Sequence, residues 1–259
     1  MENPTFYALI FAAFCIAVAI SSLLLPRILM IALRKKLVSL PNSCRDIHVK
    51  PIPRLGGVAF FPNILFTVSF IIAVSILIGQ PYPEIGLSAE FLLAICAVVV
   101  LYLTGVADDL VGVPYKYKFV AQILCSLSLP IAGLYVEGLD GFLFIGALPM
   151  WIGIPFAMLI IVFVVNTINL VDGIDGLASG ISMVVLIALG CAFMRYGMWL
   201  YTLIAFTTVG TLIPFFYFNV FGGKKKGRNL FMGDTGSLTL GFIIAWLSLK
   251  YAFGTPESP

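Results

Sequence analysis

Five aspartates stand in or beside short polar segments that interrupt long apolar runs. They are Asp108, Asp109, Asp172, Asp175 and Asp234. Basic residues and two asparagines share these segments. Carboxylates suit a hard divalent cation, and neighbouring bases suit the oxygens of a phosphate. Together they are the groups that a metal–phosphate complex requires, so the chemistry they favour is phosphoryl transfer.

The first acidic segment reads GVADDLVGVPYKYKF and closes an apolar run. Adjacent residues of a helix point about 100° apart. Asp108 and Asp109 are therefore expected to divide two tasks, one facing a metal or a nucleophile while the other orients it. The alternative for an isolated Asp-Asp pair is a solvated helix end that is charge-paired with Lys116.

The second segment reads NTINLVDGIDGLASG. Asn166 and Asn169 are three residues apart, as are Asp172 and Asp175, and this spacing predicts that each pair lies on one face of a helix. A glycine follows each aspartate directly and permits close backbone approach. Capping of the next helix, Leu177–Met194, would account for one aspartate but not for all four polar residues.

Two further segments add cations. Asp234 opens the last apolar run, where it could cap the helix, and the run Lys224–Arg228 precedes it. That run also serves as an orientation signal and an attraction for anionic lipid. In the first inner loop, Lys50 and Arg54 are placed to meet phosphate, with His48 beside them.

Composition indicates what holds these segments. Only 10% of the 259 residues are charged, 61% are hydrophobic, and the mean hydropathy is +1.10. A soluble domain carries about 25% charged residues. We predict an all-α, polytopic membrane helix bundle with about eight transmembrane helices, forming a single domain over residues 1–259. The predicted spans are Phe6–Leu25, Leu55–Ile78, Phe91–Ala107, Phe119–Val136, a span from about Met150 to Val165, Leu177–Met194, Met198–Phe221 and Ser237–Phe253.

The basic residues are sorted between the two sides of this bundle. Thirteen of the fifteen lie on the side of the segments 34–54, 108–118, 166–176 and 222–236, with only Arg195 and Lys250 on the other. Cytoplasmic loops carry the Lys and Arg excess, so these four segments are expected to face the cytoplasm and both chain ends to lie outside. The single histidine and the absence of CxxC argue against a zinc site.

The polar segments resemble the polyprenyl-phosphate N-acetylhexosamine-1-phosphate transferase family. The matching strings occur in family order from about His48 to Gly241: HVKPIPRLGG, GVADDLVGVPYKYKF, NTINLVDGIDGLASG and FMGDTGSLTLG. The string KPIPRLGG is more similar to bacterial members that use UDP-N-acetylglucosamine than to the phospho-N-acetylmuramoyl-pentapeptide transferases of peptidoglycan synthesis, which remain an alternative. A membrane transporter is the other alternative.

The resemblance implies that a polyprenyl phosphate attacks the sugar-bearing phosphorus of a UDP-N-acetylhexosamine and releases UMP. It assigns magnesium, with manganese as a substitute, to Asn169 and Asp234. It assigns catalysis to Asp108, Asp109 and Lys118, and substrate binding to Asn166, Asp172, Asp175, His48, Lys50 and Arg54. It further implies undecaprenyl phosphate as the acceptor, a place in cell wall or lipopolysaccharide biosynthesis, and no nucleic-acid partner.

The same resemblance places the protein in the cytoplasmic (inner) membrane, with the active site on the cytoplasmic face and a homodimer as a candidate state. Family members continue beyond this point into an inner loop rich in His and Arg. We therefore expect this chain, tested alone, to bind UDP-sugar weakly and to turn over slowly.

Overall fold

The computed structural model describes residues 4–35, 53–82, 88–138, 146–222 and 230–254. His48, Lys50 and the run Lys224–Arg228 lie outside these residues. The predicted all-α membrane bundle is confirmed, because seven helices of the described chain are long and apolar enough to cross a membrane. The helices are α1 (Pro4–Arg34), α2 (Phe60–Leu77) preceded by the 3₁₀ turn η1 (Gly56–Ala59), α3 (Ala89–Val111), α4 (Tyr115–Ser126), α5 (Ser128–Ile131), α6 (Met150–Val171), α7 (Leu177–Arg195), α8 (Trp199–Phe221) and α9 (Gly233–Phe253).

The fourth predicted span differs from the prediction. Instead of one helix over Phe119–Val136, the chain forms α4 of 12 residues and α5 of 4 residues, with a break at Leu127. Pro130 explains the break, since it has no N–H to donate to the Ser126 carbonyl and its ring crowds that carbonyl. The stretch from Tyr115 to Ile131 is about 26 Å long at 1.5 Å per residue, slightly less than the ~30 Å hydrocarbon core.

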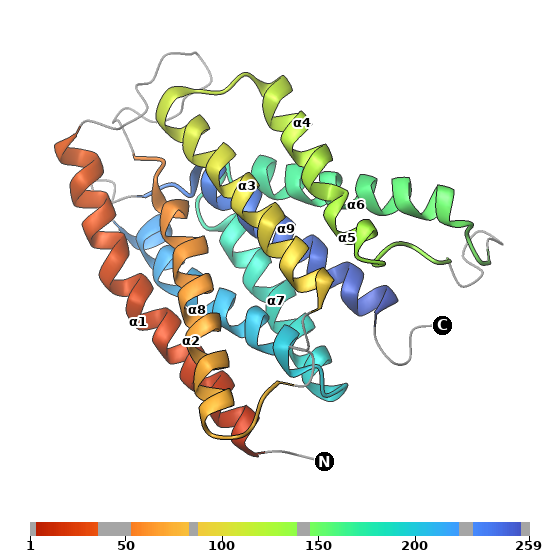
Figure 1. Cartoon of the computed structure of the whole chain (residues 1–259). Helices are drawn as coiled ribbons and strands as arrows, with labels where there is room; N and C mark the ends of the chain where they lie inside the picture. The colour runs from red at the N-terminus through yellow and green to blue at the C-terminus, as the bar shows by residue number, and fades with distance from the viewer. Residues whose placement is uncertain (1–3, 36–52, 83–87, 139–145, 223–229, 255–259) are drawn as a thin grey trace.

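Two helices form the centre of the bundle and the others surround them. In α8 and α9, 67% and 72% of the most apolar window is buried, against 28–39% in the other five spans. Helix α9 packs against α3 and α6, and α8 packs against α1 and α7 (Figure 1). The peripheral helices leave their remaining surface for lipid.

The helix ends that carry the polar segments meet at one end of this bundle. The end of α3 and the start of α4 lie at the upper edge of Figure 1, and the start of α9 lies next to the start of α2. Glycines allow this closeness: a methyl group at Gly57 would collide with the backbone of Gly236, and one at Gly105 would collide with Thr235. Small residues at such crossings let membrane helices approach closely.

A separate polar cluster joins α3, α8 and α9 at the other end. The Glu90 carboxylate accepts hydrogen bonds from Trp246 at 2.8 Å and Tyr201 at 3.2 Å, and it is ion-paired with Lys250 at 2.8 Å. Its three donors explain how a buried acid is tolerated here. The two polar clusters therefore hold α3 and α9 together at both ends.

Candidate active site

The site is built around the first turn of α9. The start of η1 and the residues before it pair with the segment before α9 through three backbone hydrogen bonds of 2.8–3.0 Å, which join Pro53, Gly56 and Gly57 to Phe231 and Met232. Gly233 then turns the chain with φ of +73°. A side chain there would strike the Arg54 carbonyl and the Asp109 carboxylate. Glycine is therefore required at this position by both conformation and space.

Carboxylates from two other segments bind the N-terminus of α9. Asp109 on α3 accepts the backbone N–H of Asp234 at 3.0 Å, the N–H of Thr235 at 3.0 Å and the Thr235 hydroxyl at 2.6 Å. Asp172 accepts a backbone hydrogen bond from Gly233. Helix N-termini carry unpaired N–H groups and a partial positive charge, so both carboxylates complement the helix end. Capping of α9 by Asp234, the alternative role, is not what the structure shows: the N-cap residue is Met232, and the Asp234 carboxylate accepts from Lys118 and Asn169 instead.

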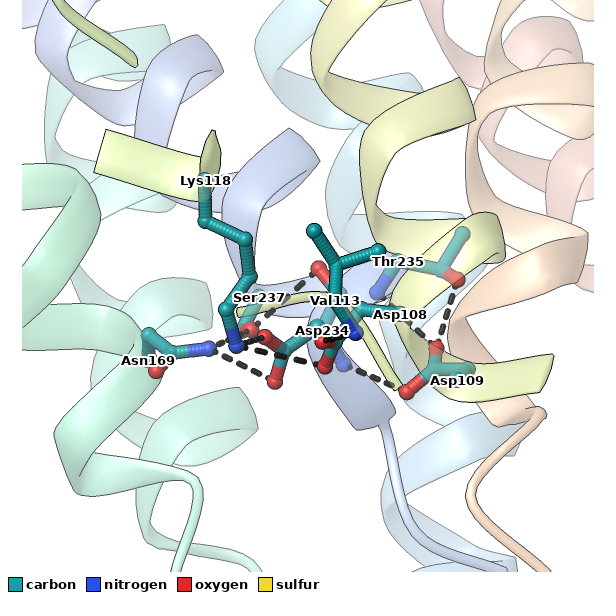
Figure 2. Close-up of polar contacts among 8 residues, drawn as sticks. All are labelled: Asp108, Asp109, Val113, Lys118, Asn169, Asp234, Thr235 and Ser237. Atoms are coloured by element: carbon teal, nitrogen blue, oxygen red, sulfur yellow. Dashed lines mark hydrogen bonds and ion pairs between the residues drawn. The ribbon is translucent and has the colours of Figure 1, made fainter. Parts of the chain in front are cut away.

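The Asp234 side chain is thereby turned toward α4 and α6, where a lysine meets it. Lys118 Nζ lies 2.6 Å from Asp234 Oδ2 and 3.2 Å from Asp108 Oδ2, and so bridges two acids from different helices (Figure 2). Asp108 Oδ1 also accepts the Val113 backbone N–H at 2.7 Å. The ion pair of Asp108 is therefore with Lys118, not with Lys116.

Asp108 and Asp109 point to different partners, as their adjacency on a helix predicted. Figure 2 shows the Asp109 carboxylate turned to one side, toward Thr235, and the Asp108 carboxylate turned toward Lys118. The three donors on Asp109 leave it as a support for α9. Asp108, by contrast, faces the open polar cluster with 17% of its side chain exposed.

The two asparagines of α6 take different partners. Asn169 donates to Asp234 Oδ1 at 3.1 Å and to the Ser237 hydroxyl at 2.8 Å. Asn166 instead donates to Gln122 Oε1 of α4 at 2.6 Å and to the Val162 carbonyl at 2.8 Å. The two asparagines share a face of α6 as their spacing predicted, but Asn169 joins the acid cluster and Asn166 joins the α4–α6 contact.

Asp172 and Asp175 do not lie on a helix, which corrects the prediction made from their spacing. Helix α6 ends at Val171, and residues 172–176 form the turn to α7, with Gly176 at φ of +78°. Asn219 of α8 accepts the Gly176 N–H at 2.5 Å and donates to the Leu230 carbonyl at 2.9 Å. This buried amide fixes the turn beside the entry to α9.

The charges of the cluster favour the binding of a cation. The pKa of Asp172 is raised to about 8, mainly by burial and also by the charges of Asp109 and Asp234, although the Gly233 hydrogen bond opposes them. Burial alone would lower the pKa of Lys118, but its hydrogen bonds and charge pairing with Asp234 and Asp108 raise it overall. Several carboxylates thus share a partly desolvated space with one ammonium group.

The donor set fits a divalent cation. Asp108, Asp109 and Asp234 each offer an oxygen, and these oxygens lie within 4.8 Å of one another. Asp109 accepts three hydrogen bonds from α9, whereas Asp108 and Asp234 accept two each, so these two carboxylates have more lone pairs to spare. Magnesium takes one or two protein carboxylates together with substrate phosphates. Asn169 would join them only with its amide oxygen turned toward the ion, since its nitrogen now faces Asp234.

Sequence reasoning placed Arg54 here but missed four supporting residues. The Arg54 carbonyl lies against Gly233, and its side chain is exposed. The missed residues that support the cluster are Gln122, Asn219, Thr235 and Ser237. Gln122 and Asn219 carried a signal, because polar amides inside apolar runs are unusual.

Known proteins are similar to this chain over the region that carries the site. The family described as Glycosyl transferase family 4 matches residues 91–252, which include every aspartate described above. A protein of Bacillus subtilis (strain 168), named probable undecaprenyl-phosphate N-acetylglucosaminyl 1-phosphate transferase, is 30% identical over 241 residues, covering 93% of this chain and 62% of that protein.

Two further relatives carry the name undecaprenyl-phosphate alpha-N-acetylglucosaminyl 1-phosphate transferase. The one from Yersinia pestis is 32% identical over 86% of this chain and 58% of its own length. The one from Escherichia coli (strain K12) is 29% identical over 88% of this chain and 59% of its own length. The chain therefore spans about three fifths of the length of the curated relatives it matches.

Proposed function

The chain belongs to glycosyl transferase family 4, and from this membership and the geometry of the acid cluster we propose that it transfers a sugar 1-phosphate from a UDP-sugar to a polyprenyl phosphate. The names of the three relatives favour N-acetylglucosamine 1-phosphate as the group and undecaprenyl phosphate as the acceptor. The observation that carries the proposal is Lys118 placed between Asp108 and Asp234, with Asn169 beside them.

In the proposed reaction, an oxygen of the acceptor phosphate forms a bond to the sugar-bearing phosphorus. The bond from that phosphorus to the bridging oxygen breaks, and UMP leaves with the electron pair. A phosphate monoester has a second pKa of about 6 and is therefore mostly dianionic at neutral pH. The attacking oxygen needs little help from a base, so the main task is to bring two anionic phosphates together.

The residues divide this task by charge. An ammonium group has three N–H donors, and Lys118 gives two to Asp108 and Asp234, which leaves a donor for a phosphate oxygen. Asp108 and Asp234, with Asn169, would hold a magnesium ion, or manganese in its place. That ion would neutralise charge on the diphosphate and stabilise the leaving UMP. Asp109 supports Asp234 through the backbone of α9.

The turn residues Asp172 and Asp175 are assigned to the nucleotide side, with Arg54 as a phosphate contact at the rim. Exposed apolar side chains next to the cluster favour a lipid acceptor: Val111 is 79% exposed and Leu170 is 80% exposed. Apolar surface of this kind at a helix end suits the boundary between the bilayer and water. The Lys and Arg bias supports a cytoplasmic orientation of this end, and the resemblance supports the inner membrane. The homodimer remains a proposal from the resemblance.

The test is transfer of label in membranes that contain the chain. UDP-N-acetylglucosamine labelled in the sugar-linked phosphate is mixed with undecaprenyl phosphate and magnesium, and lipid-phase label and UMP are measured. We expect both products in equal amounts, and both to disappear with a chelator. UDP-N-acetylmuramoyl-pentapeptide as donor tests the peptidoglycan alternative. Lipid-phase label no higher than in membranes without the chain would contradict the proposal.

A further inference from the structure

A hydrogen bond inside the membrane lies directly beneath the acid cluster. Gln122 of α4 is only 5% exposed, and its Oε1 accepts the Asn166 side chain of α6 at 2.6 Å. Gln122 follows Lys118 by four residues, and Asn166 precedes Asn169 by three. Residues at these spacings are stacked on one helix face. The Gln122–Asn166 pair therefore sits one turn deeper than the Lys118–Asp234–Asn169 contacts.

Helix α4 is short and packs against α3 and α6, so a buried polar tether can set its rotation. It has 12 residues and ends at the break before Pro130. The side of α4 that faces away from the bundle is exposed: the exposed fractions of Tyr117, Val120 and Leu124 are 69%, 54% and 67%. Its other described polar link across helices is Lys118, whose long flexible side chain can follow its partners while the helix rotates. A buried amide pair restrains the helix itself.

Asn166 is a fixed anchor for this tether. Its amide nitrogen is held by two acceptors, Gln122 Oε1 and the Val162 carbonyl one turn back on its own helix. Both N–H donors of the amide are therefore occupied, and the Asn166 rotamer is determined from within α6. Helix α6 is packed in turn against the buried α9. Through Asn166 and α6, the position of Gln122 is thus fixed relative to α9, the helix that carries Asp234.

We propose that Gln122 is a positioning residue: its hydrogen bond to Asn166 sets the rotation and depth of α4, and thereby places Lys118 Nζ between Asp108 and Asp234. Asn166 then acts through Gln122 and not by contact with the nucleotide. The consequence for turnover rests on the proposed function, whereas the consequence for the location of Lys118 does not. Misplacement by about 1 Å can lower a rate ~100-fold.

The first readout is chemical and needs no activity. Purified protein is treated briefly with an amine acylating reagent, and modification of Lys118 is measured by mass spectrometry relative to the exposed Lys116 on the same helix. Gln122→Leu and Asn166→Leu are expected to raise the Lys118 to Lys116 ratio roughly 5-fold or more, because released Lys118 is less shielded by its two acids. The control Thr167→Val, whose hydroxyl bonds only to the Phe163 carbonyl of its own helix at 2.8 Å, is expected to leave the ratio unchanged.

The second readout is a length exchange. The double variant Gln122→Asn with Asn166→Gln keeps the number of methylene groups across the pair and is expected to restore the wild-type ratio, whereas Gln122→Asn alone is not. In the transfer assay, Gln122→Leu is expected to lower kcat by ~10–100-fold with KM for the UDP-sugar within about 3-fold. The double variant Gln122→Leu with Asn166→Leu should have a kcat no lower than that of either single variant.

The outcomes separate the two proposals. A changed Lys118 ratio without any wild-type transfer would support the positioning role and overturn the proposed function. An unchanged ratio in folded Gln122→Leu and Gln122→Asn, or a length exchange that fails to restore the ratio in a folded protein, would overturn the positioning role even if transfer is observed.

Discussion

Replacement of Asp109 by asparagine separates support of α9 from direct action on substrate. The carboxylate receives three hydrogen bonds from the first turn of α9. An asparagine has one acceptor oxygen, so its amide nitrogen must face at least one of these donors. We therefore expect Asp109→Asn to loosen the start of α9 and to shift Asp234 away from Lys118.

The magnitude follows from the contacts. The least costly orientation keeps the two Thr235 bonds and loses the bond from the Asp234 N–H. A hydrogen bond to a charged group contributes ~1.5–3 kcal/mol, and the charge at a helix N-terminus adds ~0.3–2 kcal/mol. The expected loss of stability is about 2–5 kcal/mol. At ~2–4 °C per kcal/mol for a chain of this size, Tm should fall roughly 4–20 °C.

The assay is thermal unfolding in detergent, in a background that keeps the buried Cys125 as its single cysteine, with a thiol-reactive fluorophore that reports exposure of Cys125. The matched control is Thr104→Val on the same helix, because the Thr104 hydroxyl bonds only to the Val100 carbonyl one turn back at 2.8 Å. A variant that keeps the wild-type Tm but loses transfer would refute the supporting role and place Asp109 in direct contact with substrate or metal.

Three further outcomes are expected. The pKa of Asp172 is raised from 3.8 to about 8, so the folded state holds a proton that the unfolded state releases, and stability should fall as pH rises through that window. Asp172→Asn should remove this fall. In thermal unfolding scans with a chelator present, the variant should therefore gain roughly 2 kcal/mol of stability relative to wild type between pH 6 and 8. Lys118→Met should tighten magnesium binding in calorimetry, because it removes the competing cation between Asp108 and Asp234, yet lower kcat by ~10³-fold or more; weaker magnesium binding would contradict this. Lys116→Cys should be shielded from an impermeant thiol reagent outside intact cells while Gln80→Cys reacts, and the reverse pattern would invert the topology.

Much of the bundle could be predicted because the chain gives a clear signal for a membrane span. Charge-free runs bounded by polar segments located seven of the spans, and α6 begins at Met150 as predicted, directly after Pro149. The break in the fourth span was missed although its cause, Pro130, is visible in the sequence. The turn at Asp172 and Asp175 was likewise indicated by Gly173 and Gly176. Glycine adopts positive φ easily, so it ends a helix more often than it continues one.

The site was predicted as a set of residues but not as a set of contacts. Topology alone brought Asp108 and Asp234 to one end of the bundle. Spacing could not reveal that Asp109 binds the backbone of a helix 125 residues later, because that pairing depends on close contact of α3 and α9 at Gly105. The Gln122–Asn166 bond depends in the same way on the packing of α4 against α6.

The central claim is that Asp108 and Asp234 form a divalent-cation site that receives the diphosphate of a UDP-sugar. Manganese bound to the purified protein reports this directly by electron paramagnetic resonance, because ³¹P nuclei near the ion couple to its electron spins. We predict one strongly bound Mn²⁺ that gains a ³¹P coupling when UDP-N-acetylglucosamine is added, and that is lost in Asp234→Asn while Thr104→Val retains it. Equal manganese binding in Asp234→Asn, or bound manganese with no ³¹P coupling at saturating UDP-sugar, would contradict the account.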